Sequence, residues 1–161
     1  MENYMRLEIM SLGQNESFAR NAVAAFALCM NPTLTELSDI KTAVSEAVTN
    51  SIVHAYKEKA GQITIECRVE SHSCGGTLHI TVTDSGEGIE DTERAVLPFY
   101  TSLESEERSG MGFTIMQTFM DGFSLESERG KGTKVRMFRH IGGLPPEEVF
   151  KGNATKERAD A

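Results

Sequence analysis

The segment Glu46-Ala47-Val48-Thr49-Asn50 carries two polar side chains whose types and spacing could support catalysis. Glu46 and Asn50 are four residues apart, so on a helix their side chains lie above one another. A carboxylate is a suitable general base, and an amide oxygen is a donor that Mg²⁺ prefers. The alternative is an ordinary solvated helix face, and the segment taken alone favours that alternative.

A second segment, Thr83–Gly88, ends a predicted strand with a carboxylate and two glycines. Asp84 has the same parity as the apolar residues before it, which predicts that it points to the buried face of the sheet. A buried carboxylate is costly unless a donor faces it, and the amino group of an adenine would be such a donor. Gly86 and Gly88 would then allow a planar base to approach the backbone. The alternative is a strand that simply ends in a glycine-rich turn.

Gly110 and Gly112 come directly before another predicted helix. Glycines at this position expose backbone N–H groups to an anion, and the helix dipole adds to the attraction. Arg108 and Ser109 precede them, and a guanidinium can bind phosphate oxygens through two hydrogen bonds. A Gly-x-Gly pair by itself is as common in turns as in nucleotide sites.

The fourth segment, Gly130-Lys131-Gly132-Thr133, read alone, predicts a hairpin turn. Thr133 nevertheless shares the parity of Val135 and Met137 in the following strand. Its hydroxyl is therefore predicted to face the same interior as Asp84.

The elements that must position these residues follow from hydrophobic periodicity. Alternation predicts strands, and 3.6-residue spacing predicts helices, over these approximate ranges: strands 6–9, 63–69, 78–82, 122–128 and 133–139, and helices 18–30, 35–56 and 111–120. Asn15-Glu16-Ser17 is predicted to cap the first helix, Asn31-Pro32 to end it, and Thr35 to cap the second. The polar stretch 85–109 is long for a plain connection and predicts a lid.

Helices followed by mostly adjacent strands predict an α+β fold, with one mixed, mostly antiparallel sheet and helices on one face. Residues 1–141 are predicted to form the domain, and 142–161, with Pro145-Pro146, a flexible C-terminal tail.

The composition limits the possible partners. The chain has 161 residues and a net charge of −8, and no Lys/Arg cluster, which argues against direct binding of DNA or RNA. No apolar run approaches the roughly 20 residues of a membrane helix, and the N-terminus does not resemble a signal peptide. An odd number of cysteines, with no CxxC pair, favours a reducing cytoplasm.

Taken in order along residues 37–140, the four segments resemble the nucleotide site of the GHKL ATPase/kinase superfamily. The resemblance implies a two-layer α/β sandwich that binds ATP or ADP with Mg²⁺. Three longer runs, 15–20, 40–50 and 108–116, resemble the family of sporulation anti-sigma F factors of endospore-forming bacteria. That family resemblance implies a homodimer that inhibits sporulation sigma factor F and uses Mg·ATP to phosphorylate a serine of an anti-anti-sigma partner.

Residue roles follow from this resemblance. They are a catalytic base at Glu46, a Mg²⁺ ligand at Asn50, an adenine reader at Asp84 with Gly86, Gly88 and Thr133, lid and phosphate contacts at Arg108, Ser109, Gly110 and Gly112, and a partner contact at Arg20. Sequence alone favours an ordinary solvated arginine at Arg20. Two rival functions remain, namely a stress-response anti-sigma kinase that acts on another sigma factor and a binding module that senses ATP without catalysis.

Overall fold

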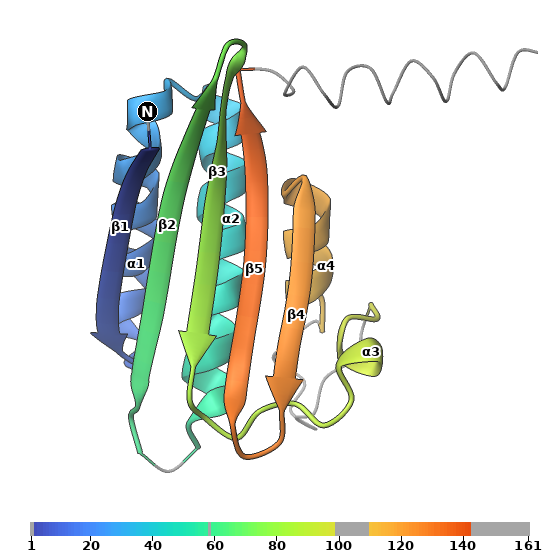
Figure 1. Ribbon diagram of the computed structural model, residues 1–161. Helices are drawn as coiled ribbons and strands as arrows, with labels where there is room; N and C mark the ends of the chain where they lie inside the picture. The colour runs from blue at the N-terminus through green and yellow to red at the C-terminus, as the bar shows by residue number, and fades with distance from the viewer. Residues whose placement is uncertain (1, 58, 99–109, 143–161) are drawn as a thin grey trace, which may run out of the picture.

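A computed structural model of the chain describes residues 2–57, 59–98 and 110–142, which form one sheet covered on one face by helices (Figure 1). The elements in chain order are β1 (Glu2–Met10), α1 (Gln14–Ala27), a 3-10 turn η1 (Leu28–Met30), α2 (Leu34–Asn50), a π turn η2 (Ser51–Ala55), β2 (Gln62–His72), β3 (Gly75–Asp84), α3 (Thr92–Ala95), α4 (Gly112–Phe119), β4 (Gly122–Glu128) and β5 (Gly132–Ile141). This is the predicted α+β, two-layer arrangement.

The sheet has the strand order β1-β2-β3-β5-β4, and all four ladders between the described strands are antiparallel. The prediction of a mixed sheet is wrong in this respect. Two antiparallel helices separate β1 from β2, so the chain returns to the end of the sheet that it left and the two strands run in opposite directions (Figure 1). β3 and β4 do share a direction, but β5 lies between them.

The first helix begins earlier than the sequence predicted. α1 starts at Gln14, and Gly13 occupies the N-cap position without a side-chain hydrogen bond. Asn15 does not cap the helix, because its side-chain amide donates to the carbonyl of Met10 instead, at 2.9 Å. The end is as predicted, since Asn31 adopts a left-handed conformation with φ of 51° after the 3-10 turn.

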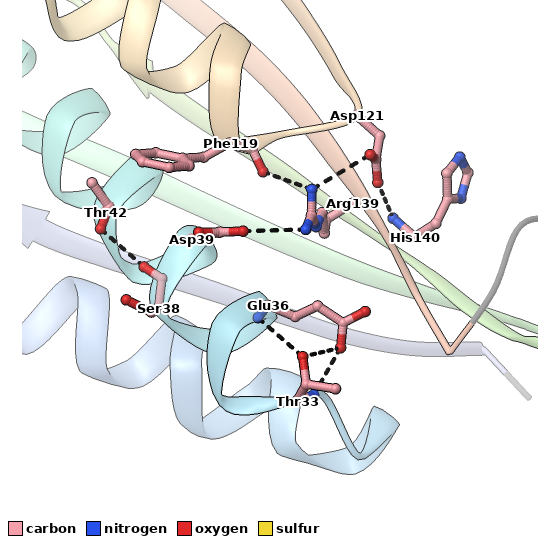
Figure 2. Close-up of polar contacts among 9 residues, drawn as sticks. All are labelled: Thr33, Glu36, Ser38, Asp39, Thr42, Phe119, Asp121, Arg139 and His140. Carbon is pink, nitrogen blue, oxygen red and sulfur yellow. Dashed lines mark hydrogen bonds and ion pairs between the residues drawn. The ribbon is translucent and has the colours of Figure 1, made fainter.

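The second helix is capped by Thr33 rather than by Thr35. The hydroxyl of Thr33 accepts from the backbone N–H of Glu36 at 3.2 Å, and the Glu36 carboxylate accepts from the backbone N–H of Thr33 at 2.7 Å. These two bonds form a capping box, whose Thr-x-x-Glu spacing is visible in the sequence (Figure 2). The α-helix ends at Asn50, and the π turn carries the chain on to Tyr56.

The core lies between the sheet and the helices. Residues of β2 and β3 that alternate along each strand, such as Ile63, Ile65, Leu78 and Ile80, are fully buried. They meet the apolar side of α2, and Met116 of α4 closes the same core. No helix within the described ranges combines the length and apolarity needed to cross a bilayer.

Arg139 joins three elements at the end of α2 that carries the capping box (Figure 2). Its guanidinium donates to the Asp39 carboxylate of α2 at 3.2 Å and to the Phe119 carbonyl of α4 at 3.0 Å. It also contacts Asp121 at 3.5 Å, and Asp121 in turn accepts from the backbone N–H of His140 at 2.7 Å. These contacts attach α2 and the end of α4 to strand β5.

We expect Arg139→Met to lower the free energy of unfolding by about 1–3 kcal/mol, because it leaves partly buried acceptors without their charged donor. Urea denaturation followed by circular dichroism measures the change. Arg129→Met is the matched control, since the ion pair of Arg129 with Glu90 is more than three-quarters exposed on both sides. Equal stability of the two variants would contradict the role of Arg139.

Candidate nucleotide site

A cleft of about 1060 Å³ opens at the end of the sheet where β3 finishes and β5 begins. The second half of α2, the π turn, the short helix α3, the start of α4 and the β4–β5 turn form its walls. Figure 1 shows why these parts meet, since the end of β3, the end of α2 and the first residues of α4 all lie at the same edge of the sandwich.

Asp84 lies on the wall of this cleft and is only 5% exposed. One carboxylate oxygen accepts from the backbone N–H groups of Gly86, at 3.1 Å, and Thr133, at 3.2 Å. The other oxygen accepts from the hydroxyl of Ser51 at 2.8 Å. An ionised carboxylate offers about four acceptor positions, so these three bonds leave room for one further donor. Strand parity thus predicted the direction of Asp84 correctly.

Burial raises the pKa of Asp84, and the three donors act in the opposite direction by stabilising the charged form. The hydrogen bonds therefore favour the ionised carboxylate, which can accept further hydrogen bonds, although its surroundings exclude water. A ligand amino group that reached Asp84 would meet a carboxylate already held in one orientation.

Ser51 is a residue of the cleft lining, bonded to Asp84, that the sequence did not single out as a site residue. It falls on the apolar side of the second helix, and it is 5% exposed in the structure, as a core residue would be. Its hydroxyl, however, donates a hydrogen bond to the carboxylate of Asp84, which lies in a strand more than thirty residues further along the chain. The available signal was a polar residue, Ser51, on the otherwise apolar stripe of the predicted helix.

We expect Ser51→Ala to lower the free energy of unfolding by about 1–3 kcal/mol, because one oxygen of a buried carboxylate loses its donor. The same change removes an influence that lowers the pKa of Asp84, so that pKa rises further. Urea denaturation measures the stability. Ser38→Ala, at an exposed position of the same helix, is the control and is expected to stay within about 0.5 kcal/mol of the wild type. An unchanged stability for Ser51→Ala would show that the bond contributes nothing.

The two glycines after Asp84 make room for the protein's own backbone. A β-carbon on Gly86 would collide with the backbone carbonyl of Ala55, and one on Gly88 would collide with the carbonyl of Glu128. Gly88 also has a φ of 70°, a conformation that favours glycine. Gly88 lines the cleft, whereas Gly86 is outside its lining. The predicted open approach for a planar base is therefore occupied by protein at Gly86.

Thr133 faces the cleft directly opposite Asp84 in the β3–β5 ladder, as its parity predicted. Its hydroxyl lies 2.8 Å from that of Ser127. The Ser127 hydroxyl donates to the Gly132 carbonyl at 2.9 Å and accepts from the backbone N–H of Ile89 at 2.7 Å. Because the Ser127 hydroxyl donates its proton to Gly132, Thr133 is the donor in the pair.

Glu46 and Asn50 lie on the α2 wall of the cleft, next to the start of α4. A β-carbon on Gly112 would lie 3.1 Å from a carboxylate oxygen of Glu46 and 3.3 Å from the amide oxygen of Asn50. The absence of a side chain at Gly112 therefore lets the first turn of α4 approach both groups. The solvated helix face that the segment favoured is instead a half-buried wall.

Of the segment from Arg108 to Gly112, the two glycines line the cleft. Gly110 lines it with a φ of 64°, and the first N–H groups of α4 begin at Gly112, where a helix has no intrahelical acceptors for them. Arg108 and Ser109 lie outside the described residues. An anion at this end of the cleft would meet backbone donors and the positive end of the helix dipole.

The oxygen-bearing side chains of the cleft fit a Mg²⁺ ion that is bound jointly by the protein and by a phosphate ligand. Within residues 2–57, 59–98 and 110–142 there is no group of three or more acidic, histidine or cysteine side chains that could hold a metal ion alone. Mg²⁺ is commonly bound by one or two protein oxygens together with substrate phosphates and waters. Asn50 lines the cleft beside the start of α4 and would supply an oxygen of this kind.

Two charged pairs that the sequence did not indicate border the cleft. Lys57 contacts Glu87 at 2.8 Å, and Arg129 contacts Glu90 at 3.4 Å. Arg20, by contrast, is outside the cleft lining, on α1, where it pairs with Glu16 at 3.5 Å and is 38% exposed. The cleft thus gathers every described candidate except Gly86 and Arg20.

Comparison with known families agrees with this geometry. Residues 12–139 match the histidine kinase-like ATPase domain, so the chain belongs to that class of ATP-binding domain. A solved structure of similar fold, the RsbU and RsbW domains of Rv1364c from Mycobacterium tuberculosis, superposes with a TM-score of 0.61. The match covers 88% of this chain and 33% of that one at 13% identity, and it therefore concerns the fold alone.

Closer relatives define the family within this class. The chain is 56% identical over 136 residues to the anti-sigma F factor of Clostridium botulinum (strain Alaska E43 / Type E3), a match that covers 84% of this chain and 93% of that protein. It is 55% identical over 140 residues to the anti-sigma F factor of Thermoanaerobacter sp. (strain X514), covering 87% and 95%. The chain belongs to the anti-sigma F factor family.

Proposed function

We propose that the chain binds and inhibits sporulation sigma factor F and, with Mg·ATP, phosphorylates a serine of an anti-anti-sigma partner. The observation that carries the proposal is the position of Glu46 beside Asn50 and Gly112, in a cleft that Asp84 also lines. A base, an oxygen ligand and helix N–H donors are the groups that phosphoryl transfer requires, because the reaction depends mainly on positioning and charge neutralisation. Close similarity to anti-sigma F factors supports the choice of partners.

At the phosphate end of the cleft, Glu46 acts as the base that accepts the proton of the substrate serine. Asn50 holds Mg²⁺, which neutralises phosphate charge when bound. The backbone N–H groups at Gly110 and Gly112 bind phosphate oxygens, and Arg108 and Ser109, outside the described residues, are proposed to add to this contact. The close approach of Gly112 to Glu46 and Asn50 supports this arrangement.

At the base end, Asp84 accepts the amino group of adenine through the acceptor position that its three donors leave open. Thr133 and Gly88 border the same part of the cleft. Gly86 acts indirectly, by allowing the turn to lie against the backbone of Ala55. The nucleotide is therefore ATP or ADP.

The proposed partner surface includes Arg20 on α1, which lies on the other side of α2 from α4 (Figure 1). Its partly exposed side chain supports a protein contact away from the cleft. We further propose that residues 1–141 act as one homodimeric domain and that 142–161, of which 143–161 lie outside the described residues, form a tail. All three cysteines are free, as a reducing cytoplasm would keep them.

Two experiments test the proposal. Gel filtration with sigma factor F, in ATP and in ADP, is expected to show a complex, and its absence in both nucleotides would overturn the anti-sigma assignment. Incubation with γ-labelled ATP and a small anti-anti-sigma protein is expected to place the label on a serine of that protein. ATP binding without any transfer would favour a binding module. A complex with a stress-response sigma factor and not with sigma factor F would favour the stress-response kinase.

A further inference from the structure

The residues that follow Asn50 form the support for the turn that carries Asp84. Ser51 donates to the Asp84 carboxylate at 2.8 Å, and the carbonyl of Ala55 accepts from the backbone N–H of Glu87 at 2.9 Å. Lys57 contacts the side chain of Glu87, also at 2.8 Å. These contacts hold both ends of the turn against the end of the helix that carries Glu46 and Asn50.

Tyr56 supplies the contact in the middle of this series. Its hydroxyl accepts from the backbone N–H of Ser85 at 2.8 Å and donates to the carbonyl of Gln62 at 2.7 Å. Ser85 directly follows Asp84, and Gln62 begins strand β2, which pairs with β3. One hydroxyl thus ties the residue after the carboxylate to the neighbouring strand.

The local backbone is built to place this ring. Ser51–Ala55 form a π turn, which holds about one residue more than an α turn and changes the direction in which Tyr56 leaves the helix. A β-carbon on Gly61 would collide with the Tyr56 ring, so the ring occupies the space that a side chain at position 61 would fill. The position of the Tyr56 ring is therefore determined by the fold, and the hydroxyl of Tyr56 lies within hydrogen-bond distance of the backbone N–H of Ser85.

We infer that Tyr56 is a positioning residue that orients the Asp84 carboxylate toward the base and so sets the preference for adenine. The inference rests on the proposed role of Asp84 in ATP binding. Asp84 Oδ1 already accepts from Gly86 and Thr133, so its direction depends on where the turn lies. With the Ser85 N–H released from Tyr56, the turn is held only at its two ends and the carboxylate loses its fixed angle.

A purely structural role for Tyr56 makes a different prediction. If the hydroxyl only stabilised the fold, its removal would weaken the binding of all nucleotides equally and leave the ratio of ATP to GTP affinity unchanged. If it orients Asp84, the ratio itself falls, because the carboxylate distinguishes the adenine amino group from the guanine carbonyl.

The test measures dissociation constants of ATP and GTP by calorimetry for wild type, Tyr56→Phe, Asp84→Asn and the double variant. Tyr4→Phe is the matched control, since the hydroxyl of Tyr4, an exposed residue of β1 outside the cleft lining, also makes a hydrogen bond, in this case to the Glu66 carboxylate at 3.0 Å. Thermal unfolding verifies that each variant is folded. We expect Tyr56→Phe to reduce the ATP/GTP affinity ratio by about threefold to tenfold, as the loss of one or two hydrogen bonds would, and Tyr4→Phe to leave it unchanged.

The double variant decides whether Tyr56 acts through Asp84. Residues that share one network are not additive, so Tyr56→Phe should not reduce the ratio further once Asp84 is Asn. An unchanged ratio in Tyr56→Phe, or an equal reduction in both Asp84 backgrounds, overturns the inference. If the wild type itself does not prefer ATP to GTP, the proposed role of Asp84 fails instead, and the two failures are thus distinguishable.

Discussion

Glu46→Ala is expected to abolish transfer of the γ-phosphate to the anti-anti-sigma partner while ATP binding persists. Removal of a general base typically costs about 10²–10⁴-fold in rate. Binding persists because the adenine contact at Asp84 and the N–H donors of α4 lie on other walls of the cleft. Labelled-phosphate transfer measures the rate, and calorimetry measures the affinity for ATP.

Glu46→Gln separates the base from the packing role of this side chain. A Cβ at Gly112 would lie only 3.1 Å from the Glu46 carboxylate, so loss of the side chain could also move α4. Glutamine keeps the shape and cannot accept the proton, so this variant is expected to be as inactive as Glu46→Ala. Activity in Glu46→Gln would show that Glu46 positions α4 and is not the base. Glu8→Ala, at an exposed position of strand β1, is the control and is expected to retain transfer.

The second large effect is expected from Asp84→Asn, which should weaken ATP binding by about 10–100-fold, as loss of a charge-assisted hydrogen bond does. The amide of asparagine cannot accept from Ser51, Gly86 and Thr133 at once, because one of its two acceptors becomes a donor. GTP serves as the internal control, since the carbonyl of guanine never donates to the carboxylate. Equal losses for ATP and GTP would contradict the adenine-reading role.

The difference in stability between the wild type and this variant is expected to depend on pH. Burial raises the pKa of Asp84 in the folded state above its ordinary value of 3.8. The folded protein therefore binds this proton more tightly than the unfolded chain does. The resulting stabilisation is fully present below the unfolded pKa and is lost as pH rises through the raised, folded pKa.

Asp84→Asn removes this titration. The free energy of unfolding of the wild type, relative to the variant, should thus fall as pH rises from below about 4 to above the raised pKa of Asp84. Urea denaturation at a series of pH values measures the difference. A difference that stays constant with pH would show that Asp84 has an ordinary pKa in the folded protein.

Local patterns in the sequence were sufficient to predict the five strands and the direction of two residues of the cleft. Alternation along β3 and β5 determines which side chains are buried, because successive residues of a strand face opposite sides. The same rule places Asp84 and Thr133 on one interior face, and the structure sets them opposite one another. The Thr-x-x-Glu spacing also contained the correct helix cap, Thr33, although the prediction chose Thr35.

Tertiary structure alone decided what these residues touch. The sequence places Ser51 on an apolar stripe and leaves Gly86 beside an open approach, whereas the fold turns the first toward Asp84 and fills the space beside the second with Ala55. Such contacts join residues about thirty positions apart, and no local spacing encodes which neighbour the chain will bring. Side-chain type and periodicity determined that a carboxylate is buried at the end of β3. The packing of the π turn against that strand decided which groups donate to the Asp84 carboxylate, and those donors hold the carboxylate in one orientation.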